Sequence, residues 1–158
     1  MKKIFLLLLV VFLSFVSCSK DSDSTTEEGR FPVAESELTP EKGKLFYLWG
    51  DYNDSNFRQY YCLYHYDLNF DLKNYGIDIP TGFNNGFKGS WDGNKKKTVS
   101  QRGFSYTFSN STLSITFSED KSKEELRIQK TQNRTLKNGD KIYMNEKPYT
   151  VQIENTSF

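Results

Sequence analysis

Residues 104–117 read FSYTFSNSTLSITF, and they predict a β-hairpin. Apolar and hydroxyl side chains alternate over 104–108 and again over 113–117, and Asn110-Ser111 between them is a turn signal. Such a period of two is typical of antiparallel strands that bury one face and leave the other to solvent. The stretch therefore indicates an antiparallel sheet in which the large apolar side chains form the buried face.

The same period of two continues on both sides of this hairpin. Alternating segments occur at 45–50, 60–72, 124–130, 142–144 and 149–153. The chain also holds 13 Phe, 10 Tyr and 2 Trp, and aromatic residues favour strands. We therefore predict one all-β domain over residues 41–158. It should contain about eight to ten short antiparallel strands, which form either a small barrel or a sandwich.

The N-terminus has the three parts of a secretory signal peptide. Two lysines precede an unbroken apolar run over residues 4–13, which is too short to span a bilayer comfortably as a permanent helix. Phe15-Val16-Ser17-Cys18 resembles the lipobox of bacterial lipoproteins, although Phe15 stands where Leu is usual. The resemblance implies that residues 1–17 are removed and that Cys18 becomes acylated, so that it can be labelled with palmitate.

Residues 18–40 have the composition of a flexible tether. Ser, Thr, Asp and Glu dominate its first half, which leaves too little apolar surface for a packed element. The run 19–23 is similar to the acidic signal that directs Bacteroidota lipoproteins to the cell surface, and Asp23-Ser24-Thr25 is similar to their O-glycosylation site. These resemblances imply a lipid-anchored outer-membrane protein, at the cell surface rather than on the periplasmic face. A plain solvated linker is the alternative interpretation.

The charge of the chain gives no indication of a nucleic-acid partner. It has 21 Lys and Arg against 20 Asp and Glu, and loss of the two signal-peptide lysines leaves the mature chain almost neutral. Attachment to the membrane is therefore expected through the N-terminal acyl chains. With Cys18 acylated, Cys62 is the one remaining cysteine, so no intramolecular disulfide can form. Its place on an apparent strand predicts a buried, inert thiol.

Catalytic and metal-binding motifs are weak in this sequence. His65 is the only histidine, no Gly-x-Ser-x-Gly elbow occurs, and one histidine with one free cysteine does not make a usual zinc site. Residues 67–78 have the oxygen spacing of an EF-hand loop, but Leu72 takes the glycine position and Asp78 the bidentate glutamate position. We therefore expect no catalytic residue, no metal and no cofactor, and we predict that the protein is not an enzyme.

Gly89-Ser90-Trp91 resembles the Gly-x-Trp that opens the first strand of lipocalins. This resemblance implies a lipocalin-like barrel, whose interior can hold a small ligand. In lipocalins the motif stands near the start of the domain, whereas here residues 41–88 precede it. The strands that remain after Trp91 are too few for a complete barrel of that family. A tryptophan that packs at the start of a strand is the alternative interpretation.

Aromatic side chains in the turn-rich regions are the candidate binding residues. Tyr and Trp present broad amphipathic faces, which stack on sugar rings or anchor protein partners. The candidates are Trp49, Tyr52, Tyr75, Phe83, Phe87 and Trp91. Core packing of at least half of them is the alternative interpretation.

The predicted function is non-catalytic binding of a glycan, a small molecule or a small lipid. The alternative is a protein-interaction module, such as an immunity protein, an enzyme inhibitor or an assembly accessory. A deep cavity lined by Tyr60, Tyr64, Tyr106 and Phe108 would favour ligand binding. A flat exposed aromatic patch would favour a protein partner.

Overall fold

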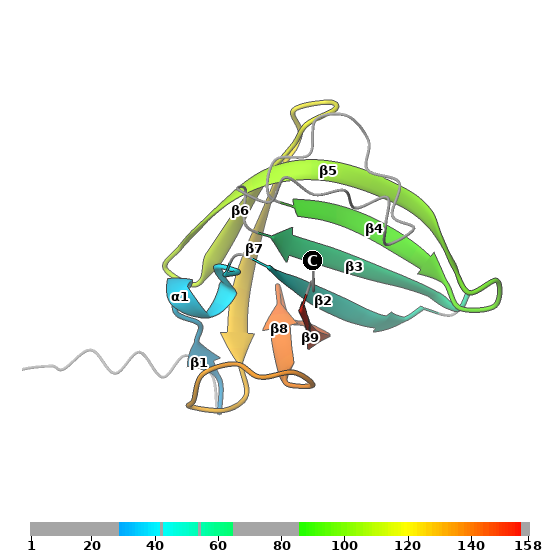
Figure 1. Ribbon diagram of the computed structural model, residues 1–158. Helices are drawn as coiled ribbons and strands as arrows, with labels where there is room; N and C mark the ends of the chain where they lie inside the picture. The colour runs from blue at the N-terminus through cyan, green and yellow to red at the C-terminus, as the bar shows by residue number, and fades with distance from the viewer. Residues whose placement is uncertain (1–28, 42, 54, 65–85, 156–158) are drawn as a thin grey trace, which may run out of the picture.

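The computed structural model describes residues 29–41, 43–53, 55–64 and 86–155. Within these ranges the chain forms nine strands and one short helix, and the strands make one antiparallel sheet (Figure 1). The elements are β1 (Phe31–Pro32), α1 (Glu35–Leu38), β2 (Lys44–Tyr52), β3 (Phe57–Tyr64), β4 (Gly86–Asp92), β5 (Lys97–Ser109), β6 (Thr112–Phe117), β7 (Lys123–Lys130), β8 (Lys141–Met144) and β9 (Lys147–Asn155). No helix in the described ranges is long and apolar enough to span a membrane.

Strands β2 to β9 close into an eight-stranded barrel. Each strand pairs antiparallel with the next along the chain, and β9 returns to β2 in a register that runs from Lys44↔Asn155 to Gly50↔Tyr149. The short β1 lies outside the barrel and pairs with the end of β7. This architecture confirms the all-β prediction. It also selects the barrel over the sandwich, because both edges of the eight-stranded sheet are paired.

Two tight turns show how the local sequence builds the hairpins. Asn110 and Ser111, between β5 and β6, have φ of 49° and 58°, and they form the turn that the sequence predicts there. Asn145 and Glu146, between β8 and β9, have φ of 46° and 66°. Left-handed conformation at both central residues gives a two-residue turn whose twist matches that of the flanking strands. Asparagine suits these positions because it tolerates this conformation better than most residues.

Apolar side chains fill the barrel from its middle to the end at which α1 lies, called here the closed end. Leu38 of α1 is fully buried in the main core cluster. Other members of that cluster are Phe104, Phe108, Leu113, Ile128 and Ile142. Gly86 makes room for one of them, because a Cβ at this position would come within 2.3 Å of the Phe104 ring.

Residues 30–40 belong to the folded domain, and we call them the N-terminal strap. The expectation of a flexible tether that extends to residue 40 was therefore wrong for this segment. β1 pairs with β7, and Val33 and Leu38 are buried in the main core. The Ser111 hydroxyl also bonds to the backbone N–H and C=O of Val33, at 3.1 and 3.0 Å. Composition misled here because a few apolar residues are enough to dock a short segment onto an existing core.

Glu37 ties the strap to the barrel through its carboxylate. Lys130 of β7 donates to it at 2.6 and 2.9 Å. The backbone N–H groups of Ala34 and Leu136 donate to it at 3.0 and 2.9 Å. The side chains of Lys130 and Glu37 are 9% and 8% exposed, so this ion pair lies in a largely dry site. A buried carboxylate of this kind depends on all of its donors.

A second buried cluster lies on the outer face of β2, β3 and β4. It consists of Leu45, Tyr47, Tyr60, Cys62, Tyr64 and Phe87, with Trp49 and Trp91 partly buried against it. Both faces of β2 are apolar as a result, and the four residues 45–48 are all buried. The Cys62 thiol is fully buried, and burial raises its pKa, so the prediction of a buried thiol is confirmed.

Candidate functional site

The end of the barrel opposite α1, called here the open end, is lined by polar side chains. Strand pairing places Lys88 of β4 opposite both Tyr61 of β3 and Arg102 of β5. Residues opposite one another share a face of the sheet, and Tyr61 belongs to the interior core, so all three positions face the barrel interior. Two residues further along each strand, toward the β2–β3 and β4–β5 turns, the inward-facing residues are Gln59, Ser90 and Ser100.

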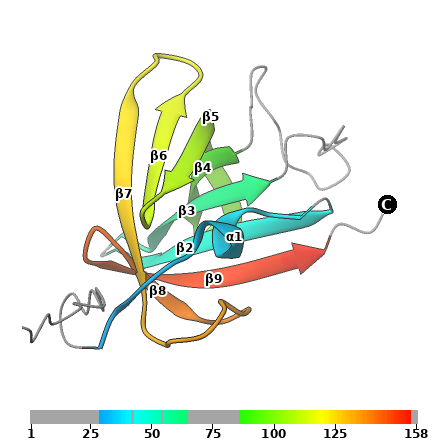
Figure 2. The ribbon, with the colours of Figure 1, turned by 90° about the vertical axis from the view of Figure 1, so that its left-hand side faces the viewer.

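Among the residues that the structure describes, the strand pairing of the barrel wall is incomplete beside this site. β8 pairs with the last three residues of β7, Ile128 to Lys130. Figure 2 shows the remainder of β7 rising away from β9 with β6 alongside it. Glu124 lies in this first part of β7, opposite Ile115 of β6. Its side chain therefore faces the interior at a level where the shorter β8 no longer lies beside β7.

Lys88 and Glu124 form an ion pair inside the open end. Lys88 Nζ lies 2.7 Å from Glu124 Oε1, and the Tyr61 hydroxyl donates to Glu124 Oε2 at 3.0 Å. The Lys88 ammonium also lies 5.0 Å from the centroid of the Tyr61 ring, within the range of a cation–π interaction. The two charged side chains are 23% and 30% exposed, so solvent reaches them. The network is therefore within reach of a molecule that enters the open end.

The Tyr61 hydroxyl is a hydrogen-bond donor throughout the physiological pH range. Burial raises its pKa first, and the nearby charge of Glu124 raises it further. The same two causes raise the pKa of Tyr149, a neighbour whose ring centroid lies 6.1 Å from that of Tyr61. Both tyrosines therefore present protonated hydroxyls, which suit them to binding polar groups.

Arg102 lies between the interior and the rim of the open end. Its guanidinium carbon is 4.0 Å from the centroid of the Phe117 ring. Its Nη2 lies 2.7 Å from the Asp120 carboxylate and 3.2 Å from the Ser122 hydroxyl, both in or beside the turn between β6 and β7. Hydrogen bonds from Ser122, more than the charge of Arg102, hold the pKa of Asp120 below its ordinary value.

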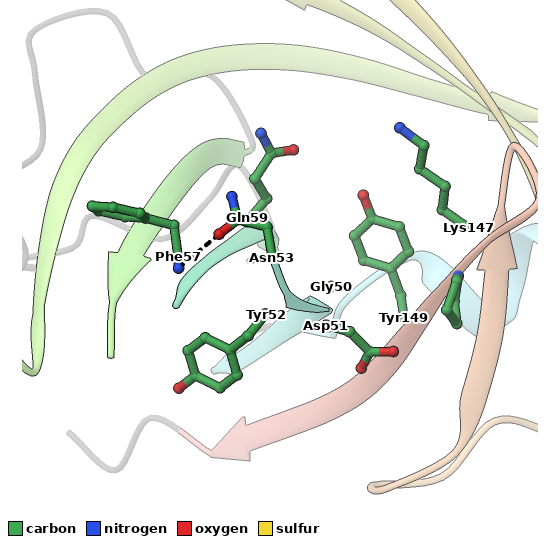
Figure 3. Close-up of a pocket in the computed structure, with 9 residues that line it drawn as sticks. Gly50, Asp51, Tyr52, Asn53, Phe57, Gln59, Lys147 and Tyr149 are labelled. Carbon is green, nitrogen blue, oxygen red and sulfur yellow. Dashed lines mark hydrogen bonds between the residues drawn. The ribbon is translucent and has the colours of Figure 1, made fainter. Parts of the chain in front are cut away.

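A pocket of about 350 Å³ adjoins this network. Its lining consists of Gly50, Asp51, Tyr52, Asn53, Phe57, Gln59, Lys147, Pro148 and Tyr149. Figure 3 shows the side chains of Gln59, Lys147 and Tyr149 pointing to one side of the β2 backbone, while those of Asp51 and Tyr52 point to the other. Tyr149 joins the pocket to the ion pair through its contact with Tyr61. Pockets of this size are at the small end of those that bind small molecules.

Gly50 allows the Tyr149 ring to approach β2 closely. A Cβ at Gly50 would come within 3.2 Å of the Tyr149 ring and 3.3 Å of the Gln59 carbonyl oxygen. The absence of a side chain at Gly50 therefore makes room for the ring at the wall of the pocket. In chemical terms the site offers hydroxyl and amide donors, ammonium and guanidinium cations, one interior carboxylate and aromatic faces. In the part of the chain that the structure describes, no three His, Cys, Asp or Glu side chains are grouped to hold a metal ion.

The structure separates the aromatic residues that the sequence analysis grouped as candidates. Tyr52 lines the pocket and is 50% exposed. Trp49, Phe87 and Trp91 belong instead to the outer-face cluster, in which Phe87 is fully buried. Tyr75 and Phe83 lie outside the described residues, as do Cys18, His65 and the segment 67–78.

The assignment of residues to the inner or outer face of the barrel corrects two further expectations, the aromatic cavity and the position of the Gly-x-Trp motif. Tyr60 and Tyr64 lie on the outer face, whereas Tyr106 and Phe108 pack with the interior core, so these four residues do not line one cavity. The Gly-x-Trp at Gly89 lies on β4, the third strand of the barrel rather than its first. A Cβ at Gly89 would come within 2.4 Å of the Tyr60 ring, so this glycine serves packing on the outer face.

Trp49 is held within the outer-face cluster by ring contacts on several sides. Its ring centroid lies 4.6 Å from that of Tyr60 and 5.8 Å from that of Tyr47. The Arg58 guanidinium lies 5.0 Å from the Trp49 ring and 5.5 Å from the Tyr52 ring. Arg58 thus connects this cluster to the exposed tyrosine at the edge of the pocket.

Sequence reasoning missed Lys88, Glu124, Gln59 and Tyr149. One signal was available for Glu124. It stands two and four residues before Leu126 and Ile128, so on a strand its side chain lies on the same face as theirs, which predicts that it faces the core. An ionisable residue at a core-facing position needs a partner, and Lys88 supplies it from 36 residues away. That pairing depends on the register of non-adjacent strands, which no local pattern reveals.

Comparison with protein-family models, with curated proteins and with solved structures found no match to this chain. The candidate site therefore rests on its own geometry. A pocket and a polar network at one end of a barrel whose other end is filled with apolar side chains are the features from which function is argued.

Proposed function

We propose that this chain is a lipid-anchored envelope protein that binds a small polar molecule or a glycan, without catalysis, at the open end of its barrel. The observation that carries the proposal is the pocket of about 350 Å³ beside the network of Lys88, Glu124 and Tyr61. Polar groups beside a pocket orient a bound ligand and make its binding specific. Phe57 adds aromatic surface at the pocket edge.

The lipobox resemblance supports the anchor in this proposal. Acylation of Cys18 would hold the domain at the outer membrane, with residues 19–29 between the lipid and the strap. Cell-surface display follows from the similarity of residues 19–23 to the Bacteroidota signal, with the periplasmic face as the alternative. A protein displayed in this way meets glycans and small molecules of the surroundings before they enter the cell.

The test is a binding screen on the unacylated mature chain, residues 18–158 with Cys18→Ser. A glycan array and a thermal-shift panel of sugars, small metabolites and small lipids should give a saturable ligand. Gln59→Ala should weaken its binding, because Gln59 lines the pocket. Gln152→Ala, an exposed glutamine on β9 outside the pocket, is the matched control and should bind normally. Equal binding by both variants would place the ligand elsewhere.

A protein-interaction module remains the second candidate function. Tyr52 is one of two large hydrophobic residues in the described ranges that are strongly exposed, and Arg58 lies against its ring. Tyrosine and arginine are the residue types that dominate the binding energy of protein interfaces. If the ligand screen gives no saturable compound, a pull-down from envelope extract with wild-type and Tyr52→Ala protein becomes the deciding experiment. Loss of one captured protein on substitution would support this function.

A further inference from the structure

We infer that the ligand of the open end carries a carboxylate, as an acidic sugar does, and that this group takes the place of Glu124 on Lys88. The inference rests on the proposed function and names the chemical class of its ligand. The Glu124 carboxylate is bound by one ammonium at 2.7 Å and by one tyrosine hydroxyl at 3.0 Å.

This arrangement is a receptor for a carboxylate that the chain fills with its own side chain. Lys88 and Tyr61 supply charge-assisted donors, which are stronger than neutral ones. Both donors are anchored on neighbouring strands, β3 and β4, at directly paired positions. The carboxylate comes from β7, and its side chain is partly exposed. Glu124 can therefore rotate toward solvent while the two donors stay in place.

The balance of charge at the open end favours an anion. Three cations, Lys88, Arg102 and Lys147, lie at interior positions or on the pocket wall. Glu124 and Asp120 neutralise the first two. Lys147 makes no ion pair within the described part of the chain, and it lines the pocket. Asp51 also lines the pocket, but Figure 3 shows its side chain pointing away from those of Gln59 and Tyr149.

The groups around the pocket suit the uncharged part of an acidic sugar. Gln59 and Tyr149 offer an amide and a hydroxyl on the same side of β2 (Figure 3). Ser90 and Ser100 occupy paired inward positions beside Gln59. Such donors and acceptors match sugar hydroxyls. Tyr149 connects this region to the carboxylate receptor through Tyr61.

A cationic ligand is the opposite possibility, and it would take the place of Lys88 on Glu124. It fits less well, because the displaced ammonium, Arg102 and Lys147 would then share the open end with a further positive charge. Like charges that share one site oppose binding. The two possibilities predict effects of opposite sign when Glu124 is neutralised.

The experiment is a calorimetric and NMR titration of the unacylated mature chain with matched sugars at low salt. D-glucuronate is compared with D-glucose, and D-galacturonate with D-galactose. We expect at least one acid to bind and its neutral partner to bind much more weakly. Affinity for the acid should fall as salt concentration rises, because the attraction is screened.

Substitutions at two positions test where the carboxylate binds. Lys88→Met should weaken binding of the acid about tenfold, because a charge-assisted hydrogen bond is lost while the apolar stem is kept. Lys88→Arg keeps the charge and should retain most of the affinity. Glu124→Gln should tighten binding by about threefold, because a competing, partly exposed internal carboxylate is removed. Circular dichroism verifies that each variant is folded.

Several outcomes would overturn the inference. The first is that an acidic sugar and its neutral partner bind equally well, and the second is that neither acid binds. The third is that the acid binds Glu124→Gln more weakly than it binds the wild-type protein. The screen for any ligand of the open end is a separate measurement, in which Gln59→Ala is the test variant. A neutral or cationic ligand that depends on Gln59 would leave the binding function standing while this inference fails.

Discussion

The carboxylate of Glu37 illustrates how one residue joins sequence-distant parts of this protein. Burial raises the pKa of this carboxyl. The hydrogen bonds from Lys130, Ala34 and Leu136 outweigh that effect and hold the pKa below its ordinary value. The lowered pKa means that the ionised form is bound more tightly in the folded state than in the unfolded chain. Stability of the strap therefore depends on the charge of this residue.

Glu37→Gln should lower the free energy of unfolding by about 3 kcal/mol, because it leaves the buried Lys130 ammonium without its counter-ion. Urea unfolding followed by tryptophan fluorescence measures the change. Glu35→Gln is the matched control, since Glu35 lies on the same short helix with an exposed side chain. An equal loss in the two variants would contradict a specific role for Glu37.

The pH dependence of stability follows from the same residue. Because the folded-state pKa of Glu37 is lowered, its contribution is complete above the ordinary value of 4.5 and is lost as the pH falls below it. Wild-type stability should therefore decline more steeply below about pH 4.5 than that of Glu37→Gln. Thermal unfolding of both proteins between pH 7 and pH 3 measures the difference. Parallel curves would show that Glu37 carries no such linkage.

Among the elements, the β8–β9 hairpin depends on its turn residue for more than chain reversal. Asn145 accepts a hydrogen bond from the Arg127 N–H at 2.8 Å and donates to the Glu125 carbonyl at 2.9 Å. It thereby extends the pairing of β7 beyond the point where β8 ends. This asparagine has two requirements to meet, a left-handed backbone and a side chain that replaces a strand neighbour.

Replacement of Asn145 separates these two requirements. Asn145→Gly keeps the left-handed backbone but loses both side-chain bonds, and it should cost about 1–2 kcal/mol. Asn145→Ala also strains the backbone at a φ of 46°, and it should cost about 1 kcal/mol more. Amide exchange at Arg127 should become faster in both variants. An unchanged exchange rate at that amide would contradict the bridging role.

The N-terminal strap behaves as an element of the domain rather than as part of the tether. Leu38→Ala should lower the free energy of unfolding by about 2–5 kcal/mol, because Leu38 is fully buried at the closed end. Ser36→Ala, an exposed residue of the same helix, should change stability by less than about 0.5 kcal/mol. Chemical denaturation measures both. A negligible effect of Leu38→Ala would restore the tether interpretation of this segment.

The whole molecule is asymmetric along the barrel axis. Leu38 and the aromatic and aliphatic core fill the closed end, while ion pairs, hydroxyls and a pocket occupy the open end. Water is displaced from the first region and reaches the second. The core that stabilises the fold and the proposed binding site are thereby separated along one axis. Substitutions at the open end can alter ligand affinity without removing the core on which the fold depends.

The proposed anchor predicts the behaviour of the precursor in the cell. Cys18→Ala should leave an unacylated precursor, because the lipobox resemblance implies that this thiol is the site of lipid attachment. Palmitate labelling of cells that express wild-type and variant protein measures this, and the label should be lost from the variant. Cys62→Ala is the control, since the Cys62 thiol is buried in the folded domain. Normal labelling of Cys18→Ala would refute the lipoprotein interpretation.

Sequence alone determined most of the strands and several turns of this domain. It did not predict β4, Gly86–Asp92, which holds Phe87 and Trp91, two residues that we expected in turn-rich regions. The alternation at 104–108 and 113–117 and the turn at Asn110-Ser111 appear in the structure as a hairpin. Residues 124–130 form a strand despite their many charges, as the spacing of Leu126 and Ile128 predicts. These features are local, because the backbone places successive side chains on opposite faces regardless of what lies beyond the strand.

Tertiary structure decided which face of each strand is inside and which residues meet there. On β2 the residues 45–48 are buried on both faces, so alternation could not distinguish the barrel interior from the outer aromatic cluster. The return of β9 to β2 and the meeting of Lys88 with Glu124 required the register of the closed barrel. Register is set by the combined packing of all the strands, because a shift of one residue would exchange the two faces. The candidate site therefore became visible only once the barrel was closed.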